Sequence, residues 1–232
     1  MGKNADDDGL VSIINKKGSM QWERVFKFGD ITILSDALVS KDKKSLYVLA
    51  HYGDRPLQNL ALVLPNSTIT LLHLTKQGKV IKRVNFTGSV SPAQRLTMCH
   101  INNNQLLIIY DKNSDWQVCE LMLRVYDNQL KLVCEKQLLK STGILPPSFR
   151  FKSTSDGGAA IAICSTECDL ELIKFNKLLD RQACYHQSHA VLSTEFDLIT
   201  HGNRFYIITD TDFLLPKEKK RIIVIALELD SR

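Results

Sequence analysis

Cysteine and histidine residues gather in one part of the C-terminal half. Cys164 and Cys168 are separated by three residues, and Cys184, His186 and His189 follow them. Zinc in proteins is usually held by four thiolate or imidazole ligands, often as two close pairs. We therefore take Cys168, Cys184, His186 and His189 as candidate zinc ligands. Unliganded thiols and a disulfide between Cys164 and Cys168 are the alternatives.

Aspartates recur in polar segments between apolar runs of the sequence. Gathered on one side of a molecule, such residues can bind Ca²⁺ or supply the carboxyl pair of a glycosidase. Aspartate is also a common loop residue that caps turns with its own side chain. The candidates at this acidic loop face are Asp54, Asp111, Asp115, Asp169, Asp210 and Asp212. The sequence has no nucleophile elbow, phosphate loop, dinucleotide fingerprint or zinc-protease motif, so it identifies no catalytic residue.

The elements that must position these residues are short apolar runs rich in Val, Ile, Leu, Tyr and Phe. Turn-forming residues bound each run, a pattern that predicts strands. Examples are residues 31–34, 45–50, 69–74, 106–110, 120–126, 159–164, 170–175, 205–209 and 222–229. The chain is therefore predicted to be all-β.

A strand, a tight turn and a second strand recur along the chain. The turns fall at positions 18, 78, 128 and 178, which are 60, 50 and 50 residues apart. A period near 50 with about four strands in each unit is typical of a β-propeller blade. We therefore predict a β-propeller of four-stranded antiparallel blades, with four blades, five blades, or a sector of a larger propeller as alternatives.

The third repeat carries the most motif-like residues. Its Ser155-Asp156-Gly157-Gly158 turn leads to the strand 159–164, and Asp169 precedes the hairpin that contains Ile173-Lys174-Phe175-Asn176. This resembles the degenerate blades of bacterial, quinoprotein-like or WD-like propeller repeat proteins. The WD dipeptide itself is missing, because Asp115-Trp116 has the reverse order. The resemblance implies a fold and no particular activity.

The repeat defines the expected domain boundaries. Residues 1–8 are expected to be a disordered or vector-derived tail, and 9–232 a single propeller-like domain. The expected blades are 30–86, 91–138, 146–187 and 190–230, the last completed by residues 9–28. Pairing of an N-terminal strand with the last blade in this way would remove exposed sheet edges. A second chain could instead complete the propeller.

The composition is that of a globular protein. The 232 residues are 44% hydrophobic and 24% charged, with a net charge of +5 spread along the chain. Nucleic acid is not expected as a partner, because its binders cluster their basic residues. No apolar run reaches the roughly 20 residues of a membrane span. Six cysteines, mostly in apolar runs, favour the cytoplasm, while the sequons at Asn66 and Asn85 leave secretion or a periplasmic location open.

Three functions follow from these observations. The first is a non-catalytic scaffold that binds a protein or peptide at its loop face, because a propeller without a catalytic motif can still present a rigid surface. The second is a carbohydrate-active hydrolase or lyase that uses the loop aspartates. The third is an interaction module stabilised by zinc. We expect no cofactor other than zinc or calcium.

Overall fold

The computed structural model describes residues 8–53, 67–88, 96–112, 118–142, 148–164, 169–188, 196–210 and 222–228. These residues form strands β1 to β17 and one short 3-10 helix, η1 (Asn102–Asn104). Within these ranges there is no helical segment with the length and apolar character needed to cross a bilayer.

The strands form five antiparallel sheets that follow one another in sequence order. The first sheet contains β1 (Gly9–Ile14) and β2 (Met20–Phe26). The second contains β3 (Ile31–Val39), β4 (Ser45–Gly53), β5 (Thr68–Thr75) and β6 (Val80–Thr87). The third contains β7 (Thr97–Ile101), β8 (Gln105–Asp111), β9 (Val118–Tyr126) and β10 (Leu132–Thr142). The fourth contains β11 (Ser148–Ser153), β12 (Ala159–Cys164), β13 (Leu170–Phe175) and β14 (Arg181–Gln187), and the fifth β15 (Phe196–His201), β16 (Arg204–Asp210) and β17 (Ile222–Glu228).

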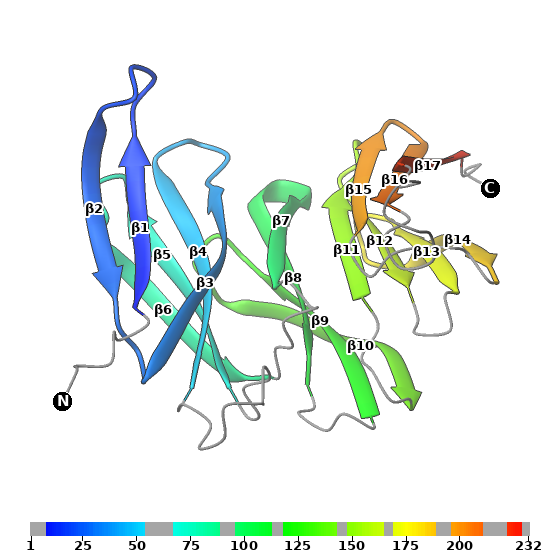
Figure 1. Ribbon diagram of the computed structural model, residues 1–232, viewed down its shortest axis with the longest axis horizontal. Coiled ribbons are helices and arrows are strands. Elements are labelled where there is room, and N and C mark those ends of the chain that lie inside the picture. Colours follow the sequence, from blue (N-terminus) through cyan, green and yellow to red (C-terminus); the bar gives the residue numbers. More distant parts are fainter. Residues whose placement is uncertain are drawn as a thin grey trace, which may run out of the picture.

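The sheets are arranged as a row of propeller blades. Figure 1 shows the first sheet at one end of the row and the fifth at the other, with the four-stranded sheets between them. Each blade is a meander in which consecutive strands pair, as in propellers. The predicted all-β propeller fold with four-stranded antiparallel blades is confirmed.

The first sheet does not complete the fifth one. In the described part of the chain β2 pairs only with β1, and the fifth sheet has three strands. The predicted completion of the last blade by residues 9–28 is therefore not formed there. The physical reason is that the first sheet packs on the second one: Val11 of β1 and Phe26 of β2 share an apolar core with Leu46 and Leu72.

A separate apolar core fills each interface between neighbouring sheets. Tyr47 and Leu71 of the second sheet pack with Ile108 of the third, for example, whereas Leu107 faces the fourth sheet. Residues that alternate along one strand thus enter different cores. The middle strands are buried on both faces, which explains why β12 reads as a continuous run of Ala, Ile and Cys.

The hairpin that joins the last two strands of a blade has the same turn in four sheets. Its first residue accepts the backbone N–H groups two and four positions later with a side-chain oxygen. These residues are Asn15, Thr75, Asp127 and Asn176. The residue three positions later has a positive φ; these are Gly18, Gly78, Leu130 and Leu179. The turn is thus the structural basis of the sequence repeat.

Gly18 isolates the backbone requirement of this turn. Its φ is +80°, and an added Cβ would meet no atom within 4 Å. We expect Gly18→Ala to lower the free energy of unfolding by about 1 kcal/mol, because only the left-handed conformation opposes the methyl group. Urea denaturation measures the change. Gly18→Asn is the control and should lose less, since Asn tolerates this conformation; an equal loss would contradict the explanation.

The last strand of a blade is also tied to the next hairpin turn. Arg24 of β2 donates to the carbonyl oxygen of Gly78 over 2.6 Å. Lys82 of β6 donates to Gln129 over 2.6 Å, and Lys136 of β10 donates to Leu179 over 3.4 Å. The same direction of contact therefore repeats along the row, from each of the first three sheets to the one that follows.

His51 is a buried titratable residue of the second sheet. It lies on β4, and its Nδ1 is 3.0 Å from Oγ of Ser35. Burial lowers the pKa of His51 to about 4, so the folded protein holds the ring neutral at pH values where an unfolded chain would protonate it.

This histidine should make folding sensitive to acid. The stability that the neutral, buried His51 contributes is fully present above the unfolded pKa near 6.5. It is lost as the pH falls from 6.5 to 4, because the unfolded chain then binds a proton that the folded protein does not. We expect His51 to remove about 3 kcal/mol of folding free energy over that window. Unfolding curves of wild type and His51→Gln at pH 7 and pH 4 measure this loss, because the effect of all other titratable groups on stability is the same in both proteins and cancels in the difference. Parallel pH profiles for the two proteins would refute the assignment.

Candidate functional site

The first strands of four consecutive blades lie next to one another. β3 contacts β7, β7 contacts β11, and β11 contacts β15. In a propeller these strands surround the central axis, where loops and strand ends from several blades meet. The side chains at this axis therefore come from segments far apart in the sequence.

A cavity of about 570 Å³ opens between these first strands. This volume is in the range that small-molecule sites occupy, roughly 300–1,000 Å³. Its charged lining residues are Asp36 of β3, Arg150 and Lys152 of β11, and Asp197 of β15. Its apolar lining includes Met98 and Cys99 of β7, Phe151 of β11, Phe196 of β15, Ile208 of β16 and Ile222 of β17.

Asp36 enters the cavity from an irregular point of β3. The register with β4 shifts between Leu34 and Asp36, which is a β-bulge. Bulges re-aim side chains and are common beside functional sites. The carboxylate accepts the N–H of Met98 over 2.8 Å through Oδ2 and that of Ala37 over 2.8 Å through Oδ1. Asp36 on β3 therefore also joins the second sheet to the third, through Met98 of β7.

The carboxyl group of Asp36 is held in a partly desolvated place. Burial raises its pKa above the ordinary aspartate value, although the backbone N–H groups of Met98 and Ala37 and the charge of Lys152 act in the opposite direction. A raised pKa keeps a larger fraction of the carboxyl protonated at a given pH. This is the property required of a general acid.

Asp197 lies in a different environment. It is exposed on β15, and its Oδ1 accepts the N–H of Leu198 over 2.8 Å. The cavity thus holds two carboxyl groups, one half-buried and one exposed to water. Carboxyl pairs in unlike environments can divide the roles of acid and base between them.

Two cations of β11 face the same cavity. Arg150 and Lys152 are two positions apart and therefore project from one face of the strand. The Arg150 guanidinium lies 5.4 Å from the centre of the Phe196 ring and donates to its neighbour's carbonyl, that of Phe149. Their N–H groups can donate to the hydroxyl or carboxylate oxygens of a ligand.

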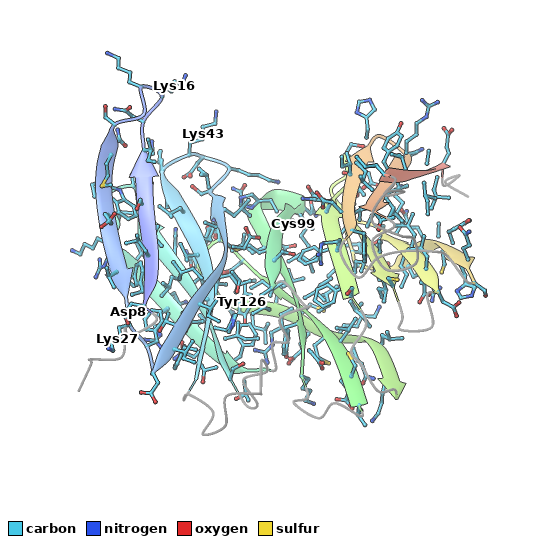
Figure 2. The ribbon with its side chains drawn as sticks, viewed as in Figure 1. Asp8, Lys16, Lys27, Lys43, Cys99 and Tyr126 are labelled. Atoms are coloured by element: carbon cyan, nitrogen blue, oxygen red, sulfur yellow. The ribbon has the colours of Figure 1, made fainter. Side chains whose placement is uncertain are left out.

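Cys99 contributes an inert wall. Figure 2 shows it near the middle of the molecule, on β7. Burial raises the pKa of the Cys99 thiol to about 12, so the group stays protonated near neutral pH. The cavity therefore offers aspartates, and no thiolate, for acid–base chemistry.

Of the aspartates predicted for a loop face, the structure describes the side chains of Asp111 and Asp169. Asp111 ends β8, is buried, and accepts the N–H of Glu120 over 3.0 Å, which fastens β8 to β9. Asp169 directly precedes β13 in the fourth sheet. Neither lines the cavity. The side chain of Asp210 and the whole of Asp54, Asp115 and Asp212 lie outside the described residues.

The predicted zinc ligands are only partly within the described residues. Cys184 and His186 are both exposed and lie two positions apart on β14. Cys184 donates to Glu171 over 3.3 Å, and Nε2 of His186 is 3.1 Å from Oγ of Ser188. Cys168 and His189 lie outside the described ranges. Within those ranges, three or more metal-ligating side chains do not come together.

The residues that line the cavity are not among the candidates predicted from the sequence. A usable signal was present in Ser-Phe-Arg-Phe-Lys-Ser (148–153), where charged side chains alternate with aromatic ones in the first strand of a blade. Asp36 and Asp197 likewise interrupt apolar first strands. A charge at that position points toward the axis, whereas Asp111 and Asp169 lie at the ends of a second and a third strand.

Comparison with known proteins gives a fold but no family. No protein-family profile and no curated protein sequence matches the chain. Among solved structures it is similar to the NanB sialidase of Streptococcus pneumoniae, with a TM-score of 0.52 and 12% identity over 93% of this chain and 34% of that one. The chain therefore spans about a third of the length of the sialidase chain. At this identity the similarity shows the propeller fold alone.

Two further structures are similar to a lesser degree. One is an alpha-L-arabinofuranosidase from Clostridium thermocellum, with a TM-score of 0.45 and 13% identity over 87% of this chain and 70% of that one. The other is a puromycin hydrolase, with a TM-score of 0.46 and 10% identity over 96% of this chain and 40% of that one.

The similarity to the sialidase corrects the expectation of a non-catalytic scaffold for a protein or peptide. That expectation assumed that a propeller without a recognisable catalytic motif serves mainly to present a surface. The sialidase has a propeller-like fold and is an enzyme, so this fold by itself does not indicate a non-catalytic scaffold.

Proposed function

We propose that this chain is a carbohydrate-active hydrolase that binds its substrate in the cavity at the propeller axis. The observation that carries the proposal is the presence of two carboxyl groups in unlike environments, Asp36 and Asp197, in that single cavity. Enzymes that hydrolyse glycosidic bonds commonly use such a pair. The pair differs from the loop aspartates first considered, but the chemistry is the same.

Each group has a distinct role in the proposed reaction. Asp36, whose pKa is raised by burial, protonates the oxygen of the leaving sugar as the glycosidic bond breaks. Asp197, exposed on β15, acts as the ionised carboxylate that assists the incoming water or attacks the sugar carbon. Arg150 and Lys152 supply donors for substrate oxygens.

The apolar lining suits a sugar as well. Phe151, Phe196 and Met98 line the cavity but are only 4%, 5% and 5% exposed, so they form an apolar wall behind the polar groups. Sites of this kind combine a mainly apolar wall with a few polar groups that fix the orientation of the ligand. The mixture of aromatic and charged groups in one cavity therefore supports a carbohydrate ligand.

A hydrolysis screen tests the proposal. The wild-type protein is incubated with neutral and acidic oligosaccharides and with alkyl and aryl glycosides, and new reducing ends are measured. We expect release from at least one substrate, and none from the double variant Asp36→Asn/Asp197→Asn. Asp30→Asn, which changes an exposed aspartate outside the cavity, is the matched control and should retain activity. Release that persists in the double variant would show that the activity lies elsewhere or belongs to a contaminant.

A further inference from the structure

The two ends of the blade row present exposed apolar sheet faces. The N-terminal end face carries Leu10 and Val25 at one end and Ile14 and Met20 at the other, with the hydrogen-bonded pair Ser12 and Glu23 between them. The C-terminal end face consists of Ile199, Ile222 and Val224 on β15 and β17. Leu10 is 53% exposed and Val224 is 56% exposed. Val11, which alternates with Leu10 and projects from the other face of β1, is buried. Apolar groups gathered in this way commonly mark an interaction surface.

Every internal junction of the row joins two faces of these same kinds. The face of the first sheet that carries Val11 packs on Val48 and Leu72 of the second sheet. The opposite face of the second sheet, with Tyr47 and Leu71, packs on the third. Each sheet therefore has one face directed to the preceding blade and one directed to the following blade. The N-terminal end face is of the first kind, and the C-terminal end face is of the second.

The geometry points to a second copy of this chain as the occupant, packed head to tail. We propose that the N-terminal end face of one copy lies on the C-terminal end face of another, which continues the packing already present at the internal junctions. Figure 1 shows the two end faces at opposite ends of the row, so one copy does not bring its own pair together. Such a contact is heterologous and forms a ring if the rotation closes.

The association would also enclose the cavity. Asp197 precedes Ile199 by two positions on β15, so both side chains project from the same face of the fifth sheet. Ile208 of β16 pairs with Val224 of β17, and both Ile208 and Ile222 line the cavity. The C-terminal end face is thus continuous with the cavity wall. A second copy seated there would become its remaining side.

Complementation between two blocked variants tests the head-to-tail arrangement. Leu10→Glu places a charge on the N-terminal end face, and Val224→Glu places one on the C-terminal end face. We expect wild type to show the mass of two or more chains by light scattering, and each variant alone to show the mass of one. An equimolar mixture should form a dimer, because each variant keeps the face that the other has lost. Leu178→Glu, at a 71% exposed turn residue away from both faces, is the control and should associate like wild type.

The outcomes separate this proposal from its competitors. Wild type with the mass of a single chain would overturn it. A single variant that still associates would overturn it and favour a symmetric contact through the face that this variant retains. A mixture that stays monomeric would also overturn it. Circular dichroism checks that the variants remain folded, and Ile14→Glu with Ile222→Glu provides a second pair. These masses do not depend on hydrolase activity, so the two proposals fail independently.

Discussion

Replacing Asp36 by Asn should lower the rate of glycoside hydrolysis by about 100-fold or more, because general acid catalysis typically contributes that much. Asn has nearly the same shape but carries no acidic proton. The loss should depend on the leaving group. Alkyl glycosides need a proton on the departing oxygen and should lose the full factor, while aryl glycosides with acidic phenols should lose much less. Steady-state rates on matched alkyl and aryl substrates measure the difference.

Asp197→Asn is the matched comparison for this experiment. A carboxylate that assists water or attacks carbon is needed whatever the leaving group, so its loss should slow both substrates to a similar extent. Equal losses for both substrates in Asp36→Asn would show that Asp36 only positions its neighbours. That alternative has a structural basis, because Asp36 accepts the Met98 and Ala37 N–H groups. Urea denaturation of Asp36→Asn measures any loss of stability from this positioning role. The two oxygens of Asp36 accept one N–H group each, whereas Asn has a single side-chain oxygen and would leave one of these donors without its acceptor.

The propeller could be predicted from the sequence because the same hairpin turn recurs in four of its sheets. The residues Asn15, Thr75, Asp127 and Asn176 each fold their turn with a side-chain oxygen, and this local chemistry leaves a visible repeat. The turn positions were less accurate in two blades. There the residue with positive φ is Leu130 or Leu179, not glycine, and the Leu side chains are buried. Tertiary packing holds a conformation that the residue type disfavours.

The site could not be predicted in the same way. Asp36 and Asp197 are far apart in the sequence, and only the packing of first strands about one axis brings them into a common cavity. A search for loop aspartates instead selected Asp111, whose carboxylate fastens two strands of its own blade. Local sequence thus identified residues with local roles. Residues that act across blades required the arrangement of the blades themselves.

Gly158→Ala should be the most destabilising of the single substitutions considered, lowering the free energy of unfolding by about 4 kcal/mol. Gly158 directly precedes β12, and an added Cβ would lie 2.1 Å from the carbonyl oxygen of Phe175 on β13 and 2.9 Å from the carbonyl carbon of Asn176. Both are backbone atoms, so no side-chain rotation relieves the clash. The pairing between β12 and β13 must shift, in a blade that packs on both of its neighbours.

The adjacent Gly157 makes the explanation testable. Gly157 has a φ of +84°, yet the nearest atom to its added Cβ is Cα of Asn102 at 3.7 Å, an ordinary contact. Gly157→Ala should therefore cost about 1 kcal/mol, the strain of a left-handed alanine. Urea denaturation of both variants compares close approach with backbone conformation at consecutive positions. If Gly157→Ala were the more damaging, the left-handed turn and not the contact with Phe175 would be what fixes this blade. If Gly158→Ala were the more damaging, or failed to fold while Gly157→Ala folded, the close approach of two backbones would be the constraint that glycine meets here.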